Sequence, residues 1–253
     1  MRKSKETRLG QIRALLNETN KLSVRDLASQ LHVTPETIRT DLDLLEEKGL
    51  VIRQHGYARA ICTTAELPFE IRKTDNLELK KAIAYEGIRQ IEDGMTVFLD
   101  SGTTVYSGLE LLKSKKDLTI VTNALPIADA CLEMGFDVIF VGGKMTRQGK
   151  RADGYFAEQI LEQLHMDLAI LASDGIYNLG GISVYSPEEY GTKRRIKERS
   201  DRLVALIDRT KFDKRGSFKV LDFTDLDLVI TNPLNESQRA QIPSQVPVLE
   251  IAG

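Results

Sequence analysis

Cysteine and histidine are scarce in this chain, and their positions favour neither a metal site nor a disulfide framework. The two cysteines, Cys62 and Cys131, are far apart and lie outside any Cys-x-x-Cys or Cys/His spacing. The three histidines, His32, His55 and His165, belong to no recognisable Ser/His/Asp grouping. The sequence therefore predicts no metal, no cofactor and no catalytic residue, in a protein kept in a reducing compartment.

Long apolar runs are also missing. No stretch approaches the roughly 20 apolar residues that a membrane-spanning helix needs. The opening residues, MRKSKETR, lack the apolar segment of a signal peptide. We therefore expect a cytoplasmic protein that has no membrane partner.

Length and charge suggest two parts. A chain of 253 residues that is 42% apolar can bury a sizeable core, and it is longer than the commonest single domain. Residues 1–60 carry a formal charge of +3 and the remainder a charge of −5. A basic head on an acidic body suits a protein whose first domain meets a polyanion, although scatter in surface charge explains the counts equally well.

The first sixty residues show three apolar stripes at helical spacing. The stripes are Leu9, Ile12, Leu15 and Leu16; Val24, Leu27, Ala28 and Leu31; and Ile38, Leu42 and Leu45. Ser23 with Asp26 forms a capping box for the second helix, and Thr34 with Pro35 reads as the N-cap and first residue of the third. Gly49 fits the residue that ends it.

The spacing of the second and third helices predicts a helix-turn-helix. Only residues 32–34 separate them, which leaves room for a tight turn but not for a long crossover. Residues 50–61 then alternate apolar and polar side chains around Gly56, a pattern typical of a short hairpin, or wing. We place this winged helix-turn-helix domain at residues 1–60.

The third helix carries the side chains that can reach DNA. With its apolar stripe facing the core, Glu36 and Thr40 point directly away at about 100° per residue. Thr37 and Arg39 flank them, and Arg39 alone suits a bidentate contact to guanine or phosphate. Basic residues at the start of the chain, Arg8 among them, are expected to contact the DNA backbone. The expected DNA-binding residues are Ser23, Thr34, Glu36, Thr37, Arg39, Thr40, Arg53, His55 and Arg59.

On topology alone, a three-helix domain that binds protein remains an alternative. The signature residues of this half favour DNA, because they resemble the N-terminal domain of the DeoR family of bacterial regulators of sugar metabolism. Two positions differ from the family's usual pattern: Thr40 stands where a second basic residue is usual, and Tyr57 where a second glycine is usual. The residues that carry the resemblance are Arg8, Ile12, Thr34, Thr37-Ile38-Arg39, Asp41-Leu42, Gly49-Leu50, Arg53 and His55-Gly56.

Beyond a linker at residues 61–67, the pattern changes to that of a second domain, residues 68–253. A helical segment covers residues 67–91, and compact apolar runs then alternate with helical stretches. Such alternation predicts a mostly parallel sheet with helices on both faces, a Rossmann-like α/β domain. The runs lie at 96–99, 118–121, 138–141, 168–171, 203–207 and 228–231.

Polar residues follow these runs, where ligands bind in open parallel sheets. The first run leads into residues 100–104, Asp-Ser-Gly-Thr-Thr, whose backbone N–H groups and hydroxyls could hold a phosphate. A plain turn that caps a helix is equally compatible with these five residues. A basic run, Lys144, Arg147, Lys150 and Arg151, could also hold an anion, although such a run is more often a solvated loop.

This half is similar to the sensor domain of the DeoR family, through motifs such as Lys80-Lys81, Thr122-Asn123, Gly142-Gly143, Glu189 with Lys193, and Asp208 with Lys211-Phe212. The resemblance implies a phosphorylated sugar effector, with residues 101–104 around its phosphate. The expected effector-binding residues are Asp100, Ser101, Gly102, Thr103, Thr104, Asn123, Gly143, Arg147, Asp174, Gly175 and Lys193.

The family's sensor domain resembles ribose-5-phosphate isomerase, so an enzyme is the rival hypothesis. Isomerases carry an Asp-Gly-x-Asp-Glu run, whereas this chain has Tyr177 and Asn178 in place of the last two carboxylates. We therefore expect a sensor and not an enzyme: a repressor of a carbohydrate operon, acting on double-stranded operator DNA as a homodimer or homotetramer. The alternatives are a sugar-phosphate isomerase with an appended basic domain and an interaction scaffold without a ligand.

Overall fold

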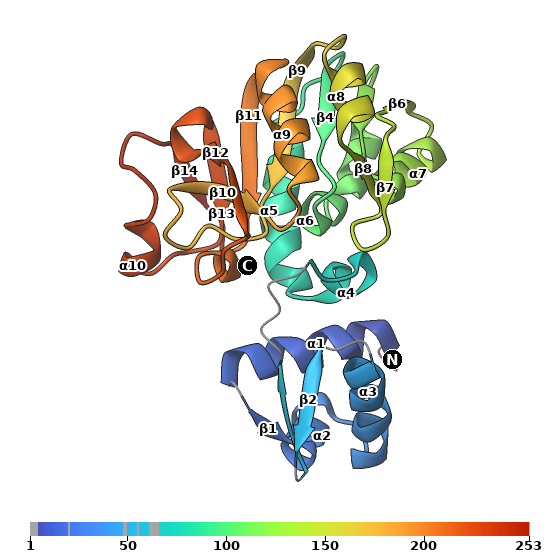
Figure 1. Ribbon diagram of the computed structural model, residues 1–253, viewed down its shortest axis with the longest axis vertical. Coiled ribbons are helices and arrows are strands. Elements are labelled where there is room, and N and C mark those ends of the chain that lie inside the picture. The colour runs from blue at the N-terminus through green and yellow to red at the C-terminus, as the bar shows by residue number, and fades with distance from the viewer. Residues whose placement is uncertain (1–4, 20, 48–49, 55, 61–65, 253) are drawn as a thin grey trace. The chain divides into compact units, whose positions relative to one another are not determined.

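The computed structural model describes residues 5–19, 21–47, 50–54, 56–60 and 66–252 (Figure 1). By its internal contacts the chain divides into two compact units, Met1–Asn76 and Leu77–Gly253. In the described part of the chain, no helix is both long and apolar enough to cross a membrane. The two units are described separately below.

The first unit is a winged helix-turn-helix. Its three strands form one antiparallel sheet in the order β1-β3-β2. The predicted apolar stripes form a single core with Leu50 and Val51, and Leu15 lies at its margin. The elements are α1 (Lys5–Thr19), β1 (Leu22–Ser23), α2 (Val24–Leu31), α3 (Pro35–Glu47), β2 (Val51–Gln54), β3 (Tyr57–Ala60) and α4 (Phe69–Thr74).

Local hydrogen bonds start both helices of the motif where the sequence predicts. The Ser23 hydroxyl accepts a hydrogen bond from the backbone N–H of Asp26 (3.1 Å) and donates one to the Asp26 carboxylate (2.6 Å). Thr34 accepts from the N–H of Thr37 (3.2 Å), and Pro35 is the first helical residue of α3. His32 closes α2 with a left-handed φ of 54°, and the three-residue turn is confirmed.

The wing is the hairpin β2–β3, in which Gln54 pairs with Tyr57. Gly56 has a φ of +81°, a conformation that side chains disfavour, which explains the glycine between the two strands. Two predicted features, His55 in the wing and Gly49 at the end of α3, lie outside the described residues. Strand β1, which the sequence did not predict, adds to the free edge of β3.

The helical segment expected over residues 67–91 is two helices, α4 and α5 (Leu77–Arg89). Asn76 separates them with a left-handed φ of 53°. Asp75 accepts a hydrogen bond from Arg13 of α1 (2.8 Å), and α4 packs against α1. The units consequently divide after Asn76, whereas the sequence placed the start of the second domain at residue 68.

The second unit is built on one seven-stranded parallel sheet in the order β14-β13-β11-β9-β4-β5-β6. All six predicted runs are strands of this sheet; β14 was not predicted. The strands are β4 (Thr96–Leu99), β5 (Thr119–Thr122), β6 (Asp137–Phe140), β9 (Met166–Ala172), β11 (Ser200–Ile207), β13 (Leu228–Thr231) and β14 (Val248–Glu250). Two antiparallel pairs lie outside it: β7 (Lys144–Thr146) with β8 (Arg151–Asp153), and β10 (Gly181–Val184) with β12 (Phe218–Asp222).

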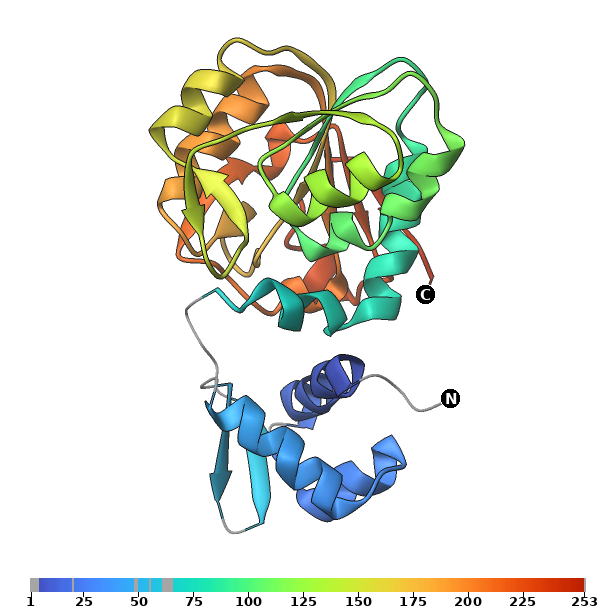
Figure 2. The ribbon, with the colours of Figure 1, turned by 90° about the vertical axis from the view of Figure 1, so that its right-hand side faces the viewer.

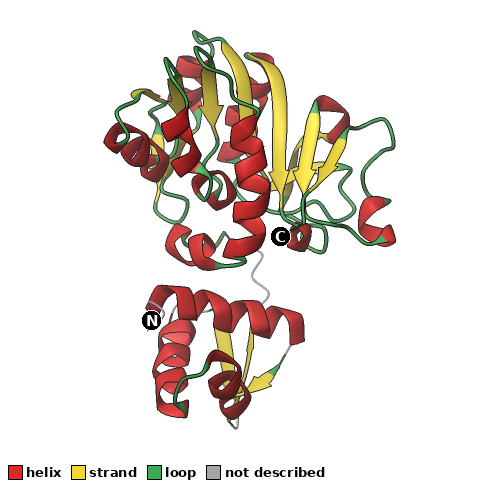
Figure 3. Ribbon diagram, turned by 180° about the vertical axis from the view of Figure 1, so that it is seen from behind, coloured by secondary structure: helices red, strands yellow, loops and turns green. Residues whose placement is uncertain are grey.

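Helices cover both faces of the sheet, as the alternation of runs and helical stretches predicts (Figures 2 and 3). Along β9, Ala169 and Leu171 belong to the core beneath α8 and α9, while Leu168 and Ile170 belong to the core beneath α5 and α7. Because both faces are buried, the strands are almost continuously apolar. The helical elements are α6 (Thr103–Tyr106), η1 (Leu109–Ser114), α7 (Leu125–Glu133), α8 (Tyr155–Leu161), α9 (Glu188–Glu198), η2 (Arg209–Lys211), η3 (Phe223–Asp225) and α10 (Glu236–Arg239).

The order of strands reverses between β4 and β9. From β4 the chain proceeds outward through β5 and β6 and then returns to β9 on the other side of β4. In open parallel sheets, ligands bind beyond the carboxyl ends of the strands at such a point. Residues 100–104 and 173–175 lie there, directly after the two strands.

Candidate DNA-binding surface and effector site

Helix α3 presents the face that the sequence predicts. Ile38 and Leu42 are fully buried, while Glu36, Arg39 and Thr40 are exposed. Thr37 is half-buried, with its hydroxyl 2.9 Å from that of Thr34. Arg39 forms an ion pair with Glu36, and about half of its side chain remains exposed, so it can exchange this partner for a base or a phosphate.

A concave surface joins the start of α2, the start of α3 and the wing. It contains five of the predicted DNA-binding residues, Ser23, Thr34, Glu36, Arg39 and Arg53. It also contains Arg25 and Gln54, which the sequence analysis did not single out, and Tyr57, which it named only as a departure from the family's usual pattern.

The other predicted residues lie elsewhere. Thr37 and Thr40 lie on α3 without lining the concave surface, and Arg59 is exposed on β3 opposite Ile52. His55 lies outside the described residues. The guanidinium of Arg53 already forms an ion pair with Asp43 of the same unit.

Tyr57 occupies the tip of the wing, where the family usually has a glycine. Its ring is exposed, and the ammonium of Lys21 lies 4.2 Å from the ring centroid. A cation held over an aromatic face is stabilised by the ring's quadrupole. Tyr57 therefore holds the ammonium of Lys21 next to the wing, a contact that a glycine could not make.

The second unit collects ionisable side chains at the carboxyl ends of β4 and β9. Asp100, at the end of β4, accepts hydrogen bonds from the N–H groups of Ser101 (2.9 Å) and Ala172 (2.8 Å). Its carboxylate also pairs with Lys193 of α9, and both side chains are buried. This ion pair links the ends of the two central strands to α9.

The predicted phosphate-binding turn lies beside a lysine from another helix. Lys80 of α5 donates a hydrogen bond to the Thr103 hydroxyl (3.0 Å), and both side chains are buried. Ser101 and Thr104 are buried as well. A Cβ on Gly102 would lie 2.2 Å from the Cβ of Ala172, so only glycine fits where the turn passes the end of β9.

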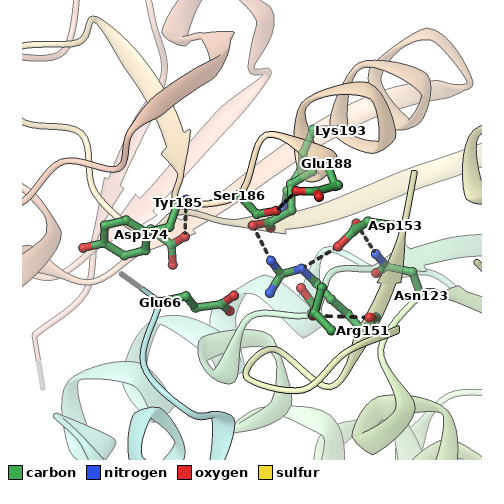
Figure 4. A network of polar contacts seen from close by, with 12 residues as sticks. Glu66, Asn123, Arg151, Asp153, Asp174, Tyr185, Ser186, Glu188 and Lys193 are labelled. Carbon is green, nitrogen blue, oxygen red and sulfur yellow. Dashed lines mark hydrogen bonds and ion pairs between the residues drawn. The ribbon is translucent and has the colours of Figure 1, made fainter. Parts of the chain in front are cut away.

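A buried network centred on Arg151 adjoins this turn (Figure 4). Arg151 donates from Nε to Asp153 (2.9 Å) and forms an ion pair with Glu189 of α9. Asn123 donates from Nδ2 to Asp153 (3.2 Å) and to the backbone oxygen of Ala152 (2.8 Å). All four side chains are at least nine-tenths buried. The network joins the ends of β5 and β8 to α9.

Burial changes the protonation of two acids in this network. It raises the pKa of Glu189 well above the ordinary range, and the neighbouring carboxylates of Asp174 and Asp153 add to that rise against the opposing charges of Arg151 and Lys193. Burial also raises the pKa of Asp153. Each acid therefore ionises at a higher pH than it would in water, because a low-dielectric site disfavours charge.

Of the seven predicted effector residues outside the turn at 101–104, four meet here and three do not. Asp100, Asn123 and Lys193 belong to the connected groups, and half-buried Asp174 accepts from the N–H of Tyr185 (3.1 Å). Arg147 instead lies exposed in the turn between β7 and β8. Gly143 and Gly175 lie where the backbone is too close for a side chain. A Cβ on Gly143 would lie 2.8 Å from the backbone oxygen of Asp153, and a Cβ on Gly175 would lie 2.4 Å from the backbone of Lys214.

Sequence reasoning missed Lys80, Arg151, Asp153 and Glu189 as site residues. Arg151 belonged to the basic run, for which a solvated loop was the commoner interpretation, yet it is among the largest fully buried side chains of the described chain. The available signal was the pair Arg151-x-Asp153, since residues two apart on a strand share a face.

A second buried group lies at the ends of β11 and β13. Asp208 accepts from the N–H of Thr210 (3.1 Å), and its Oδ2 has no hydrogen-bond partner among the described residues. Burial opposes the charge of this carboxylate, but Lys211, Lys80 and Lys214 outweigh burial, so its pKa is lowered. Lys80 thus serves both this group and Thr103.

Comparison with known proteins identifies the family. The DeoR-like helix-turn-helix domain matches residues 8–64, and the DeoR C terminal sensor domain matches residues 75–233. The chain belongs to the DeoR family. It is a DNA-binding transcriptional regulator and not an enzyme, and the predicted fold class is confirmed.

Similar curated proteins are repressors. A putative aga operon transcriptional repressor of Escherichia coli O157:H7 is 31% identical over 88% of this chain and 84% of its own length. The glycerol-3-phosphate regulon repressor of Escherichia coli K12 is 30% identical over 86% and 87%. The lactose phosphotransferase system repressor of Staphylococcus epidermidis is 30% identical over 97% and 99%.

Similar solved structures include a D-ribose-5-phosphate isomerase, 19% identical over 53% of each chain with a TM-score of 0.40. The eIF2B beta of Chaetomium thermophilum is 13% identical over 90% of this chain and 63% of its own, with a TM-score of 0.45. Within this chain, the side chains of Tyr177 and Asn178 are exposed.

Proposed function

We propose that this protein represses a carbohydrate operon and that a phosphorylated sugar controls its binding to the operator. The observation that carries the proposal is the group of buried ionisable side chains at the ends of β4 and β9, in a chain that also has a DNA-reading helix. The repressors of similar sequence support the carbohydrate role through their names, which refer to the aga operon, the glycerol-3-phosphate regulon and the lactose phosphotransferase system.

In this proposal the phosphate of the effector binds at residues 101–104. Ser101, Thr103 and Thr104 supply hydroxyls, and Lys80 supplies positive charge at the Thr103 end. The sugar hydroxyls contact the polar side chains at the neighbouring strand ends, Asp100, Asn123, Asp174 and Lys193. Because Asp100, Asn123 and Lys193 are buried, an effector reaches them only if the loops beyond the strand ends move. Such a movement can be coupled to operator affinity.

DNA recognition in this proposal uses the exposed end of α3 in the major groove and the wing on the backbone. One short helix reads too few base pairs for selective occupancy, so two or more copies bind paired half-sites as a homodimer or homotetramer. As a regulator of transcription, the protein acts in the cytoplasm.

The test is operator binding followed by fluorescence anisotropy, with the DNA upstream of the chain's own gene and a panel of phosphorylated and unphosphorylated sugars. At least one phosphorylated sugar should change operator affinity about tenfold or more, a coupling typical of allosteric regulators, while its unphosphorylated form does not. Replacing Lys193 by Ala should remove the response and leave operator affinity nearly intact. If no phosphorylated sugar changes operator affinity or thermal stability, the proposal is wrong.

A further inference from the structure

We infer that Lys21, which precedes β1 outside both the helix-turn-helix and the wing hairpin, contacts the DNA backbone beside Arg59, and that the ring of Tyr57 holds it in position. The inference rests on the proposed function and adds a phosphate contact to the DNA-binding surface. It comes from the pairing of β1 with β3 and from the contact between Lys21 and Tyr57.

Two arginines of the surface beside α3 are already paired within the unit. Arg39 and Arg53 each form an ion pair with an acidic side chain. Each gives up that partner when it binds a phosphate, so the net gain is smaller than for an unpaired cation. Lys21 and Arg59 are exposed, and neither forms an ion pair with any residue that the structure describes. These two cations can therefore bind DNA without losing an acidic partner.

The register of the wing sheet brings Lys21 to the level of Arg59. Ser23 of β1 pairs with Tyr57 of β3 in an antiparallel ladder. Lys21, two positions before Ser23, is therefore level with Arg59, two positions after Tyr57. Ala58, between Tyr57 and Arg59, is buried, whereas its two neighbours are exposed. Because side chains alternate along a strand, Tyr57 and Arg59 share the face of the sheet that is turned away from the core.

The neighbouring positions on β2 carry no charge that neutralises these cations. Gln54 pairs with Tyr57, and Ile52 pairs with Arg59, so neither facing residue is acidic. Like charges at facing positions of adjacent strands repel one another. A DNA backbone brings phosphates to such a face, and their oxygens accept hydrogen bonds from both an ammonium and a guanidinium. The binding of DNA therefore relieves a repulsion that the free protein carries.

The ring of Tyr57 fixes the direction of the lysine side chain. The ammonium of Lys21 lies 4.2 Å from the ring centroid, where the negative face of the ring attracts a cation. A lysine side chain that moves freely loses rotamer freedom when it binds a phosphate, whereas a side chain held by a ring has already lost part of it. Tyr57 is therefore a positioning residue, and Lys21 is the phosphate contact.

Tyr57 also connects Lys21 to the surface that carries α3. The concave surface lined by Tyr57 includes Ser23 at the start of α2, and Thr34 and Arg39 at the start of α3. A duplex whose major groove receives the start of α3 lies over this surface, so its backbone passes the wing. An acidic protein segment is the competing ligand for two exposed cations. The continuity of this face with the start of α3 favours DNA.

The experiment is DNA binding by the full chain, followed by fluorescence anisotropy on operator and scrambled DNA at several salt concentrations. Lys21→Met and Arg59→Met should each weaken binding by the same factor on both DNAs and lower the slope of log affinity against log salt by about one. Lys116→Met, which removes an exposed lysine of the sensor unit, is the matched control and should keep the parent slope. An unchanged slope in Lys21→Met contradicts the inference and leaves the proposed function intact, whereas failure of the parent to bind operator overturns both.

A double variant tests the role of Tyr57. Tyr57→Ala should weaken binding about threefold, the size of an exposed contact between a cation and a ring. Tyr57→Phe keeps the ring and should bind like the parent. Tyr57→Ala combined with Lys21→Met should bind no more weakly than Lys21→Met alone, because the ring acts through the lysine. If the two losses multiply instead, Tyr57 contacts DNA by itself and the positioning role is wrong.

Discussion

Arg8 of α1 holds the buried carboxylate of Asp41, at the centre of α3, through two hydrogen bonds: Nε to Oδ2 at 2.5 Å and Nη2 to Oδ1 at 3.1 Å. The sequence suggested that Arg8 contacts the DNA backbone, but the structure turns it inward. The pKa of Arg8 is raised by its hydrogen bond to Asp41. The first helix therefore fixes the orientation of α3, the helix proposed to read DNA.

We expect Arg8→Ala to destabilise the DNA-binding unit by about 3 kcal/mol or more, because it leaves Asp41 buried without its partner. Thermal unfolding followed by circular dichroism measures the effect. Arg25→Ala, which removes an exposed arginine from the same unit, should change stability by about 0.5 kcal/mol or less. Equal losses in the two variants would contradict the role given to Arg8.

Arg39→Ala should weaken specific binding more than non-specific binding. A bidentate contact to one base is worth about 1–3 kcal/mol of discrimination, whereas a phosphate contact contributes equally on every sequence. Anisotropy titrations on operator and scrambled DNA at several salt concentrations separate the two terms. An equal loss on both DNAs would make Arg39 a phosphate contact only.

The fold was predictable where neighbouring residues determine structure. Ser23 and Thr34 cap helices through contacts three residues along the chain, and β4, β5, β9, β11 and β13 are apolar because both sheet faces are buried along them. The short β14 escaped prediction because its apolar run is only two residues long, Val248 and Leu249, between Pro247 and Glu250.

The site was predictable only in part, because several of its contacts join residues that are far apart in the chain. Asp100 and Asn123 follow strand ends, which the sequence reveals. The burial of Arg151 depends on Glu189, 38 positions away, and the position of Lys80 depends on a helix that packs beside Thr103. Such contacts are set by tertiary packing, so the spacing of Arg151 and Asp153 shows that the two share a strand face but not that the arginine is buried.

The free energy of unfolding should decrease as the pH rises, because the acids around Arg151 ionise. The pKa of Glu189 is higher in the folded state than in the unfolded state. The contribution of Glu189 to the free energy of unfolding is therefore fully present below its unfolded pKa of 4.5 and is lost as the pH rises through its folded pKa. Thermal scans from about pH 4 upward should show a shallower decline for Glu189→Gln than for the parent. Glu133→Gln, exposed on α7, is the control and should retain the parent slope.

Gly102 should resist substitution unless Ala172 becomes smaller. The Cβ of Gly102→Ala would lie 2.2 Å from that of Ala172, so the turn after β4 must shift. We expect a loss of about 1–3 kcal/mol, typical of overpacking. The double variant Gly102→Ala with Ala172→Gly removes the overlap and should recover part of the loss; no recovery would place the strain elsewhere.

Cys131 should be chemically silent in the folded protein. Its thiol lies in the core beneath α7, and burial raises its pKa to about 12. In a Cys62→Ser variant, a thiol reagent at pH 8 should therefore label Cys131 only as fast as the sensor unit opens. Fast labelling without denaturant would contradict this packing.

Helix α4 has a practical consequence for anyone who recombines these regulators. Because it folds against α1 and ends just before the left-handed Asn76, it travels with the DNA-binding unit and not with the sensor. A chimaera joined in the segment after the wing would give the DNA reader a foreign α4 that is not matched to its α1. Joining two regulators between Asn76 and Leu77 keeps each packed unit whole, so the operator choice of one can be combined with the effector response of another.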